Sequence, residues 1–443
     1  MGRRPGWMKE TNMIDIKLLR AEPDVFKRAA EVKGYNVCFI DDLLAVDRDL
    51  LQAKQELQDA RTQQNQAGKE IAKLTGDAKQ AAVAKMSELK SLAKSAQETI
   101  DRLEPKFHEL MLLMPQIPDP AAPIGEDDKG NVEARRVGEP RTFDFEIQDH
   151  VALGESLDII DLPRAVKLAG ARNFILKGAG AMLHQAVLRL AIDTITARGF
   201  ELMTVPVLVN ENVMEGTGYF PVGRDEAYLC ERDGQALVGT AEVPVTAYHS
   251  DEILEAADLP KTYTAVSTCF RREAGSAGKD THGLYRIHFF DKVEQVVICR
   301  ADAAESARWH ETIIANAEAV LQALELPYRV MEVCTGDMGQ GKVRMYDIET
   351  WMPSRGCYSE THSASRFHDF QARRLNLRYR DEDGKIHFCH TLNNTVIASP
   401  RILIPLLELN QQADGSVTVP TALRAYMGGR ERICPKIPKA PKA

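Results

Sequence analysis

Apolar side chains recur every three or four residues over a long N-terminal stretch of the chain. The pattern covers residues 43–74, stops at Thr75-Gly76-Asp77, and resumes over residues 86–114. This spacing is the seam of a coiled coil, and Gly and Asp at the interruption end one helix and begin another. We therefore predict an antiparallel helical hairpin over about residues 43–114, with arms on the order of 50 Å long.

The pattern changes after the hairpin. Four prolines lie within residues 115–123, and helical stretches then alternate with β-rich runs such as residues 262–270, 285–298 and 375–379. This alternation favours an α+β domain with a mainly antiparallel sheet. We predict three parts of the chain: a loose extension over 1–12, a domain with the hairpin over 13–122, and a second domain over 123–443.

Composition and charge narrow the class of protein. The 443 residues carry a net charge of −8, and no apolar window is long enough to span a membrane. The eight cysteines contain no CxxC pair, which argues against a disulfide framework and against a thiolate zinc site. We expect a cytoplasmic protein with reduced thiols and no membrane contact.

The turn of the predicted hairpin is basic although the whole chain is acidic. Between residues 69 and 94 six lysines face three acidic residues, and no aromatic residue lies between Phe39 and Phe107. Nucleic acid held there would be gripped through phosphate and shape rather than by base stacking. Taken alone, the pattern fits a solvated coiled-coil face equally well. The candidate nucleic-acid contacts are Lys69, Lys73, Lys79 and Lys85.

A second informative segment covers residues 269–294, where two β-patterned runs flank a polar, Gly-rich connection. Period-two alternation puts Arg271 and Glu273 on one face of the outgoing strand. It puts Arg286, His288, Phe290 and Glu294 on one face of the return strand. Arginine, an aromatic ring and carboxylates together suit an adenine nucleotide, although an isolated charged hairpin is more often a solvated edge. The chain has no P-loop motif and no convincing Rossmann motif.

The segment FRREAGSAGKDTHGLYRIHFFDKVEQ resembles motif 2 of the class II aminoacyl-tRNA synthetases, and specifically of the seryl-tRNA synthetase family. GFELMTVPVLVNENVMEGTGYFP resembles motif 1 and HTLNNTVIASPRILIPLLE resembles motif 3. VGTAEVP resembles the family's serine-binding loop, and YSETHSASRFHDFQARR its ATP-and-metal strand. The resemblance covers residues 13–430. It implies an α-helical tRNA-binding arm followed by a catalytic domain on an antiparallel sheet flanked by helices, in a homodimer.

The resemblance also implies roles for individual residues. Arg271 and Arg401 are the expected catalytic residues, and Glu360 and Ser363 are expected to hold Mg²⁺ through ATP. The expected ATP-binding residues are Arg271, Arg272, Glu273, Ile287, Phe290, Glu360, Thr361, His362, Ser363 and Arg401. The expected serine-binding residues are Thr240, Ala241, Glu242, Arg271, Glu294 and Thr395.

The implied activity is ligation of L-serine to the 3′ end of tRNA(Ser), with tRNA(Sec) as a further acceptor, through a seryl-adenylate. The chain departs from the family pattern in places: Phe289 stands where Gln is common, Ser359 where Arg is common, and Pro400 where Gly is common. Two alternatives remain open. One is a paralogue that adenylates an amino acid but transfers it to a carrier protein, and the other is a coiled-coil scaffold without catalytic activity.

Overall fold

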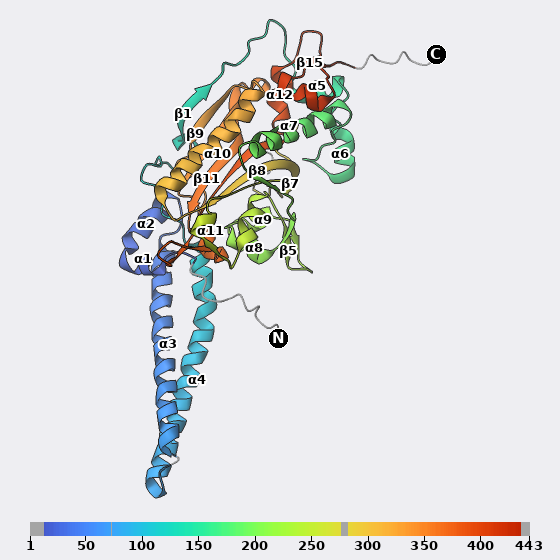
Figure 1. Ribbon diagram of the computed structural model, residues 1–443. Coiled ribbons are helices and arrows are strands. Elements are labelled where there is room, and N and C mark those ends of the chain that lie inside the picture. Colours follow the sequence, from blue (N-terminus) through green and yellow to red (C-terminus); the bar gives the residue numbers. More distant parts are fainter. Residues whose placement is uncertain (1–12, 72, 276–281, 436–443) are drawn as a thin grey trace. The chain divides into compact units, whose positions relative to one another are not determined.

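The computed structural model describes residues 13–71, 73–275 and 282–435. The predicted extension over 1–12 and the centre of the Gly-rich connection, residues 276–281, lie outside the described residues. The chain forms two compact units (Figure 1). One is Ile14–Pro115, and the other contains the residues from Gln116 onward.

The N-terminal unit is entirely helical. Two short helices, α1 (Ile16–Ala21) and α2 (Pro23–Val32), precede the long antiparallel pair α3 (Cys38–Ile71) and α4 (Gly76–Leu113). The predicted hairpin is therefore confirmed, with its first helix starting five residues before Leu43. The seam is buried as its spacing requires, through Leu43, Val46, Leu50, Ala53, Leu57 and Ala60 of α3 and Leu89, Ala96, Ile100 and Leu110 of α4.

The second unit is built on an eight-stranded sheet in the order β1-β9-β10-β11-β14-β8-β7-β2. Adjacent strands are antiparallel except β2 and β7, which run parallel. The predicted antiparallel α+β class is confirmed. The strands are β1 (Val132–Val137), β2 (Glu201–Met203), β7 (Lys261–Phe270), β8 (Phe289–Cys299), β9 (Tyr328–Glu332), β10 (Arg344–Met352), β11 (Cys357–His368) and β14 (His390–Ser399).

Two helices, α7 (Ala179–Thr196) and α10 (Ala303–Ala323), pack on one face of this sheet against β8, β11 and β14. Their apolar side chains form the main core with residues of the sheet such as Val293, Ala364 and Val396. Side chains of a strand alternate between its faces, so this core takes one set and leaves the other set for the opposite face. No helix of the described residues has the length and apolar character needed to cross a membrane.

Smaller elements surround the sheet (Figure 1). The remaining α-helices are α5 (His150–Ser156), α6 (Leu162–Ala169), α8 (Glu211–Gly216), α9 (Glu242–Thr246), α11 (Phe370–Leu375), α12 (Leu403–Leu409) and α13 (Thr421–Arg424). The remaining strands are β3 (Leu208–Asn210), β4 (Leu229–Cys230), β5 (Gln235–Leu237), β6 (Ile253–Glu255), β12 (Arg378–Arg380), β13 (Ile386–Phe388), β15 (Val417–Thr418) and β16 (Arg432–Ile433).

Two predicted β-rich runs begin later than the sequence pattern indicated. The return strand β8 begins at Phe289 rather than Tyr285, because β7 ends at Phe270 and the two strands pair only from Phe270 and Phe289 outward. Arg271, Glu273, Arg286 and His288 therefore lie on the connecting segment and not on strands. The run predicted over 375–379 begins at Arg378, since Leu375 ends helix α11.

Candidate active site

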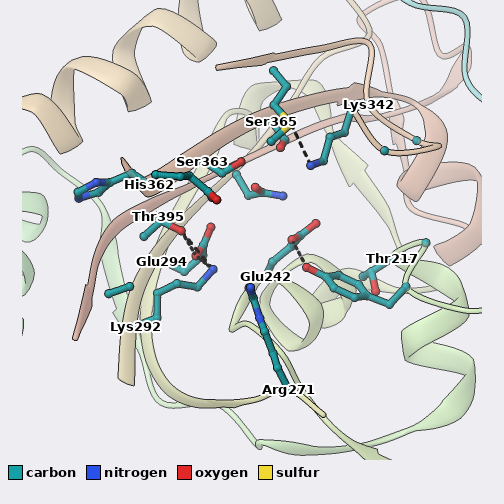
Figure 2. Close-up of a pocket in the computed structure, with 18 of the residues that line it drawn as sticks. Thr217, Glu242, Arg271, Lys292, Glu294, Lys342, His362, Ser363, Ser365 and Thr395 are labelled. Atoms are coloured by element: carbon teal, nitrogen blue, oxygen red, sulfur yellow. Dashed lines mark hydrogen bonds and ion pairs between the residues drawn. The ribbon is translucent and has the colours of Figure 1, made fainter. Parts of the chain in front are cut away.

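A pocket of about 350 Å³ lies on the face of the sheet that α7 and α10 leave open (Figure 2). Strand β8 contributes Phe290, Lys292 and Glu294, which alternate with the core residue Val293. Strand β11 contributes Glu360 and its neighbours, β14 contributes Asn393, Thr395 and Ala398, and the segments around residues 217–219, 271–273, 285–287 and 339–342 close the sides. Three strands of one sheet thus supply the floor, and loops supply the walls.

Strand β11 carries an irregularity at the pocket. Its pairing with β10 shifts between Ile348 and Glu349, so Thr361 is an extra residue between the paired residues Glu360 and His362. Because of this bulge, Glu360 and Ser363 pair with Glu349 and Asp347, which lie two residues apart on one face of β10. Side chains three residues apart on β11 therefore both reach the pocket.

A cluster of buried polar side chains occupies the floor between β8 and β14. Glu294 and Thr395 are direct neighbours across the two strands. The Lys292 Nζ lies 2.5 Å from the Glu294 Oε2 and donates to the Thr395 Oγ1 at 3.2 Å. The hydroxyls of Thr240 and Thr395 each donate to the same Glu294 Oε2 at 3.4 Å. The structure thus joins three of the predicted serine-binding residues to a lysine in one hydrogen-bonded group.

A second buried carboxyl, Glu242, stands at the start of α9 beside this cluster. The Tyr219 hydroxyl donates to its Oε2 at 2.9 Å, and the Gln371 amide donates to its Oε1 at 2.7 Å. Burial raises the pKa of Glu242, and the nearby negative charge of Glu294 raises this pKa further. The pocket floor therefore holds two buried acidic groups beside the buried ammonium of Lys292.

Two arginines stand at the sides of the pocket. The Arg271 guanidinium lies 5.1 Å from the centre of the Phe290 ring. The Arg401 guanidinium lies 4.5 Å from the centre of the Tyr285 ring, and it donates to the backbone carbonyls of Tyr285 and Glu360 at 3.1 Å each. Arg401 also lies 3.9 Å from the Glu360 carboxylate, a longer contact than its backbone hydrogen bonds. Rings and backbone carbonyls do not neutralise a guanidinium, so both arginines can still attract an anionic ligand.

Most of the predicted site residues line this pocket: Glu242, Arg271, Glu273, Ile287, Phe290, Glu294, Glu360, Thr361, His362, Ser363, Thr395 and Arg401. Thr240 and Ala241 are fully buried just below its surface. Arg272 is outside the lining, and its guanidinium donates to the Asp225 carbonyl at 3.3 Å. The Glu273 carboxylate is paired with Arg286 at 2.7 Å.

The sequence patterns did not single out several residues that the fold brings to the site. Lys292 lies midway between Phe290 and Glu294, so period-two alternation is the signal that could have identified it. Tyr219 and Tyr285 come from loops, which carry no such signal. Asp347 is half-buried opposite Ser363, and desolvation of its carboxyl raises its pKa well above the usual value, with the negative charge of Glu360 adding to the effect.

The predicted tRNA contacts belong to the N-terminal unit, on the helical hairpin. Lys69, Lys73, Lys79 and Lys85 are all exposed around the turn between α3 and α4. Their ammonium groups are free to approach a phosphate backbone, although exposure of this kind is also what a solvated helix face shows.

Comparison with known proteins identifies both units. Residues 13–118 match the family model of the seryl-tRNA synthetase N-terminal domain, and residues 228–410 match that of the class II tRNA synthetase core domain (G, H, P, S and T). The serine–tRNA ligase of Deinococcus radiodurans is 48% identical over 95% of this chain and 98% of its own length. That of Corynebacterium diphtheriae is 43% identical over 96% of this chain and 100% of its own.

Solved structures agree with the sequence matches. The seryl-tRNA synthetase from Pyrococcus horikoshii, complexed with ATP, superposes with a TM-score of 0.90 at 37% identity, covering 96% of this chain and all of that one. The cytoplasmic enzyme of Naegleria fowleri, in complex with AMP, gives a TM-score of 0.83 at 26% identity, covering 94% and 96% of the two chains. The chain therefore belongs to the seryl-tRNA synthetase family of class II aminoacyl-tRNA synthetases.

Proposed function

We propose that the chain is a serine–tRNA ligase that forms seryl-adenylate and pyrophosphate from L-serine and Mg-ATP, and then transfers serine to the 3′ end of tRNA(Ser). The observation that carries the proposal is the buried group of Thr240, Lys292, Glu294 and Thr395 beside Arg271. It offers a carboxylate, a hydroxyl and a guanidinium within one small pocket. These match the ammonium, the hydroxyl and the carboxylate of serine.

The serine subsite works by complementing each polar group of the substrate. Glu294 accepts from the substrate ammonium, Thr395 meets the side-chain hydroxyl, and Thr240, Ala241 and Glu242 shape the wall. Alanine has no hydroxyl and would leave buried polar groups without a partner, which is costly in an enclosed pocket. The proposed chemistry of the pocket therefore includes discrimination against alanine.

The nucleotide subsite takes the part of the same pocket that Glu273, Phe290 and Arg401 line. In the proposed complex, adenine stacks on Phe290 and contacts Glu273 and the Ile287 backbone, while Arg401 reaches the phosphates. Arg272, Thr361 and His362 complete the proposed set of ATP-binding residues. Burial lowers the pKa of His362 to about 3, so this ring is neutral at physiological pH and acts through shape.

The reaction needs no general base from the protein. The serine carboxylate is already ionised, and it attacks the α-phosphorus of ATP while pyrophosphate leaves. Arg271 stabilises the negative charge that develops on the α-phosphate, so positioning and charge stabilisation carry the step. Arg271 and Arg401 are the catalytic residues of this proposal.

The residues present also fit a magnesium ion. The bulge at Thr361 puts a carboxylate and a hydroxyl, those of Glu360 and Ser363, on one face of β11, and such oxygen atoms are the ligands that Mg²⁺ prefers. Glu360 and Ser363 would hold the ion together with ATP, and the ion would supply positive charge that neutralises the triphosphate.

The partners form the last part of the proposal. Lys69, Lys73, Lys79 and Lys85 contact the tRNA backbone, and tRNA(Sec) is a second acceptor. The protein is proposed to act in the cytoplasm as a homodimer. The edge strand β2, which leaves about half of Leu202 exposed, lies in the segment that resembles the family's dimer motif and supports the last point.

Serine-dependent ATP–pyrophosphate exchange tests the proposal directly. The protein should exchange with serine and not with alanine or threonine, and Arg271→Ala should abolish the exchange while the fold, followed by circular dichroism, stays intact. Addition of tRNA(Ser) or tRNA(Sec) and labelled serine then identifies the acceptor. A folded protein without serine-dependent exchange refutes the enzymatic activity, and labelling of a carrier thiol instead of tRNA refutes the acceptor.

A further inference from the structure

Lys292 belongs to the buried group at the pocket floor, but the proposal above gives it no contact with a substrate. Lys292 is 7% exposed and lies on the pocket face of β8 between Phe290 and Glu294. A buried ammonium is costly unless it is paired and hydrogen-bonded, so a lysine at this depth needs partners. Its partners are the two residues proposed to recognise serine, Glu294 and Thr395 (Figure 2).

The hydrogen bonds around Glu294 are unevenly shared between its two oxygens. Lys292, Thr240 and Thr395 all converge on Oε2, at distances of 2.5 to 3.4 Å. Among the described residues, none donates to Oε1. Three donors on one oxygen fix the rotation of the carboxylate and leave the other oxygen for a ligand.

The charges of the pocket floor also favour a ligand with a single ammonium. Glu242 and Glu294 carry up to two negative charges, and Lys292 supplies one positive charge between them and Thr395. When both carboxyls are ionised, these three groups leave one negative charge for one substrate ammonium. A ligand with a second ammonium at the position of the serine hydroxyl would meet Lys292 at close range, and like charges repel strongly in a buried site.

We propose that Lys292 is a specificity-determining residue, which positions Glu294 and Thr395 for serine and rejects amino acids with a cationic side chain of similar size. This inference rests on the proposed function and deepens it. It gives Lys292, which lies on β8 beside Glu294, a direct effect on which side chain the pocket accepts.

The test uses L-2,3-diaminopropionate, which replaces the serine hydroxyl with an amine. At mildly acidic pH both amines of this analogue carry protons. The kcat/KM of the wild-type enzyme for this analogue should be at least a hundredfold lower than for serine. If the analogue only inhibits, its inhibition constant should be at least a hundredfold higher than the KM for serine. Lys292→Met should raise the KM for serine at least tenfold with little change in the KM for ATP, and should shift the preference toward the diamine at least tenfold. Lys292→Arg keeps the charge and should retain the wild-type preference.

The controls separate the possible failures. Lys261→Met removes a lysine at the far end of β7, outside the pocket, and should leave both KM values and the preference unchanged. If wild-type protein shows no serine-dependent exchange, the proposed function fails. If it exchanges with serine but accepts the diamine equally well, or if Lys292→Met is folded and leaves the preference unchanged, the role of Lys292 is refuted. The wild-type comparison alone decides the matter if Lys292→Met does not fold.

Discussion

Thr395 shows how much selectivity one hydroxyl can carry. It accepts from Lys292 and donates to Glu294, so its removal leaves both buried charges with one partner fewer. We predict that Thr395→Val lowers the preference for serine over alanine by up to about tenfold, since the lost hydrogen bond joins two neutral hydroxyls and such a bond contributes roughly 0.5–1.5 kcal/mol. The ratio of kcat/KM values in pyrophosphate exchange measures this.

Thr262→Val is the matched control for this prediction. The Thr262 hydroxyl donates to the Gly199 carbonyl at 3.2 Å, outside the pocket. Its removal should leave the serine-to-alanine preference unchanged. An unchanged preference in Thr395→Val would show that another group reads the substrate hydroxyl.

Among individual residues, the sequence predicted those that belong to recognisable motifs. It did not predict the residues whose role depends on a neighbour on another strand of the sheet. Arg271, Phe290 and Arg401 were found because each belongs to a continuous segment with a family pattern. Lys292 was missed because its meaning depends on Thr395, which lies on another strand and is brought near only by the pairing of β8 with β14.

Among the elements, α7 is joined to the sheet by a buried histidine. His184 bonds through Nδ1 to the Ser399 hydroxyl at 2.8 Å and through Nε2 to the Asp291 carboxylate at 2.9 Å. We predict that His184→Leu lowers the free energy of unfolding by about 2–4 kcal/mol, because two buried hydrogen bonds are lost and their partners are left behind. Urea denaturation measures the change.

His387 provides the comparison. It is 39% exposed and paired with Asp381 at 2.7 Å, so His387→Leu should cost less than about 1 kcal/mol, as exposed pairs do. Equal losses of unfolding free energy in His184→Leu and His387→Leu would mean that the hydrogen bonds of His184 contribute no more than an ordinary surface contact.

Buried histidines on α10, β11 and β14 make the sheet sensitive to acid. Burial lowers the pKa of His310 and His362 to about 3 and that of His368 and His390 to about 4. In the unfolded chain these rings take up protons near pH 6.5, whereas in the folded protein they do not. Their contribution to stability is therefore complete above pH 6.5 and is lost as the pH falls toward 4 and then 3.

The size of this effect can be measured residue by residue. Each such histidine contributes up to about 1.4 kcal/mol per pH unit to the slope of stability against pH. Urea denaturation should show that the free energy of unfolding of the wild type falls steeply between pH 7 and pH 5. In His368→Phe the slope of this free energy against pH should be smaller by about the contribution of one histidine. A stability that does not change over this range would contradict the prediction.

The elements themselves were largely predictable, and their edges were not. Strand β7 follows its predicted range to within one residue. The late start of β8 was not predictable, because Tyr285-Arg286-Ile287-His288 alternates as a strand does. In the fold the His288 carbonyl still accepts from the Arg271 amide, but the His288 amide donates to the Arg172 carbonyl, so the strand pairing ends there. The bulge of β11 was not predictable either, because it exists only relative to the neighbouring strand.

For the whole molecule, the division into two units predicts that the two half-reactions can be separated. The chain has a net charge of −8, but the exposed lysines of the hairpin turn form a local basic surface. We predict that replacing Lys69, Lys73, Lys79 and Lys85 with Glu leaves serine-dependent pyrophosphate exchange unchanged and lowers the rate of tRNA serylation at least tenfold. The salt dependence of tRNA binding should weaken as well, because fewer counterions are released.

Charge reversal elsewhere is the control. Lys129 and Lys385 are exposed on the other unit, and their replacement with Glu should have a much smaller effect on serylation. A quadruple variant that serylates tRNA at the wild-type rate would show that the hairpin turn does not contact the acceptor.

The bulge at Thr361 has a consequence for how this sequence can change over time. The bulge interrupts the regular alternation of side chains along the strand. Because of it, Glu360 pairs on the same face as Ser363, three positions away, and not on the face of His362. Deletion of the extra residue itself would leave the pairs on both sides intact and keep Glu360 and Ser363 on one face, whereas deletion of a paired residue would turn every side chain beyond it to the opposite face of the sheet. In this strand, therefore, a change of length is expected to cost less at Thr361 than at the paired positions on either side of it.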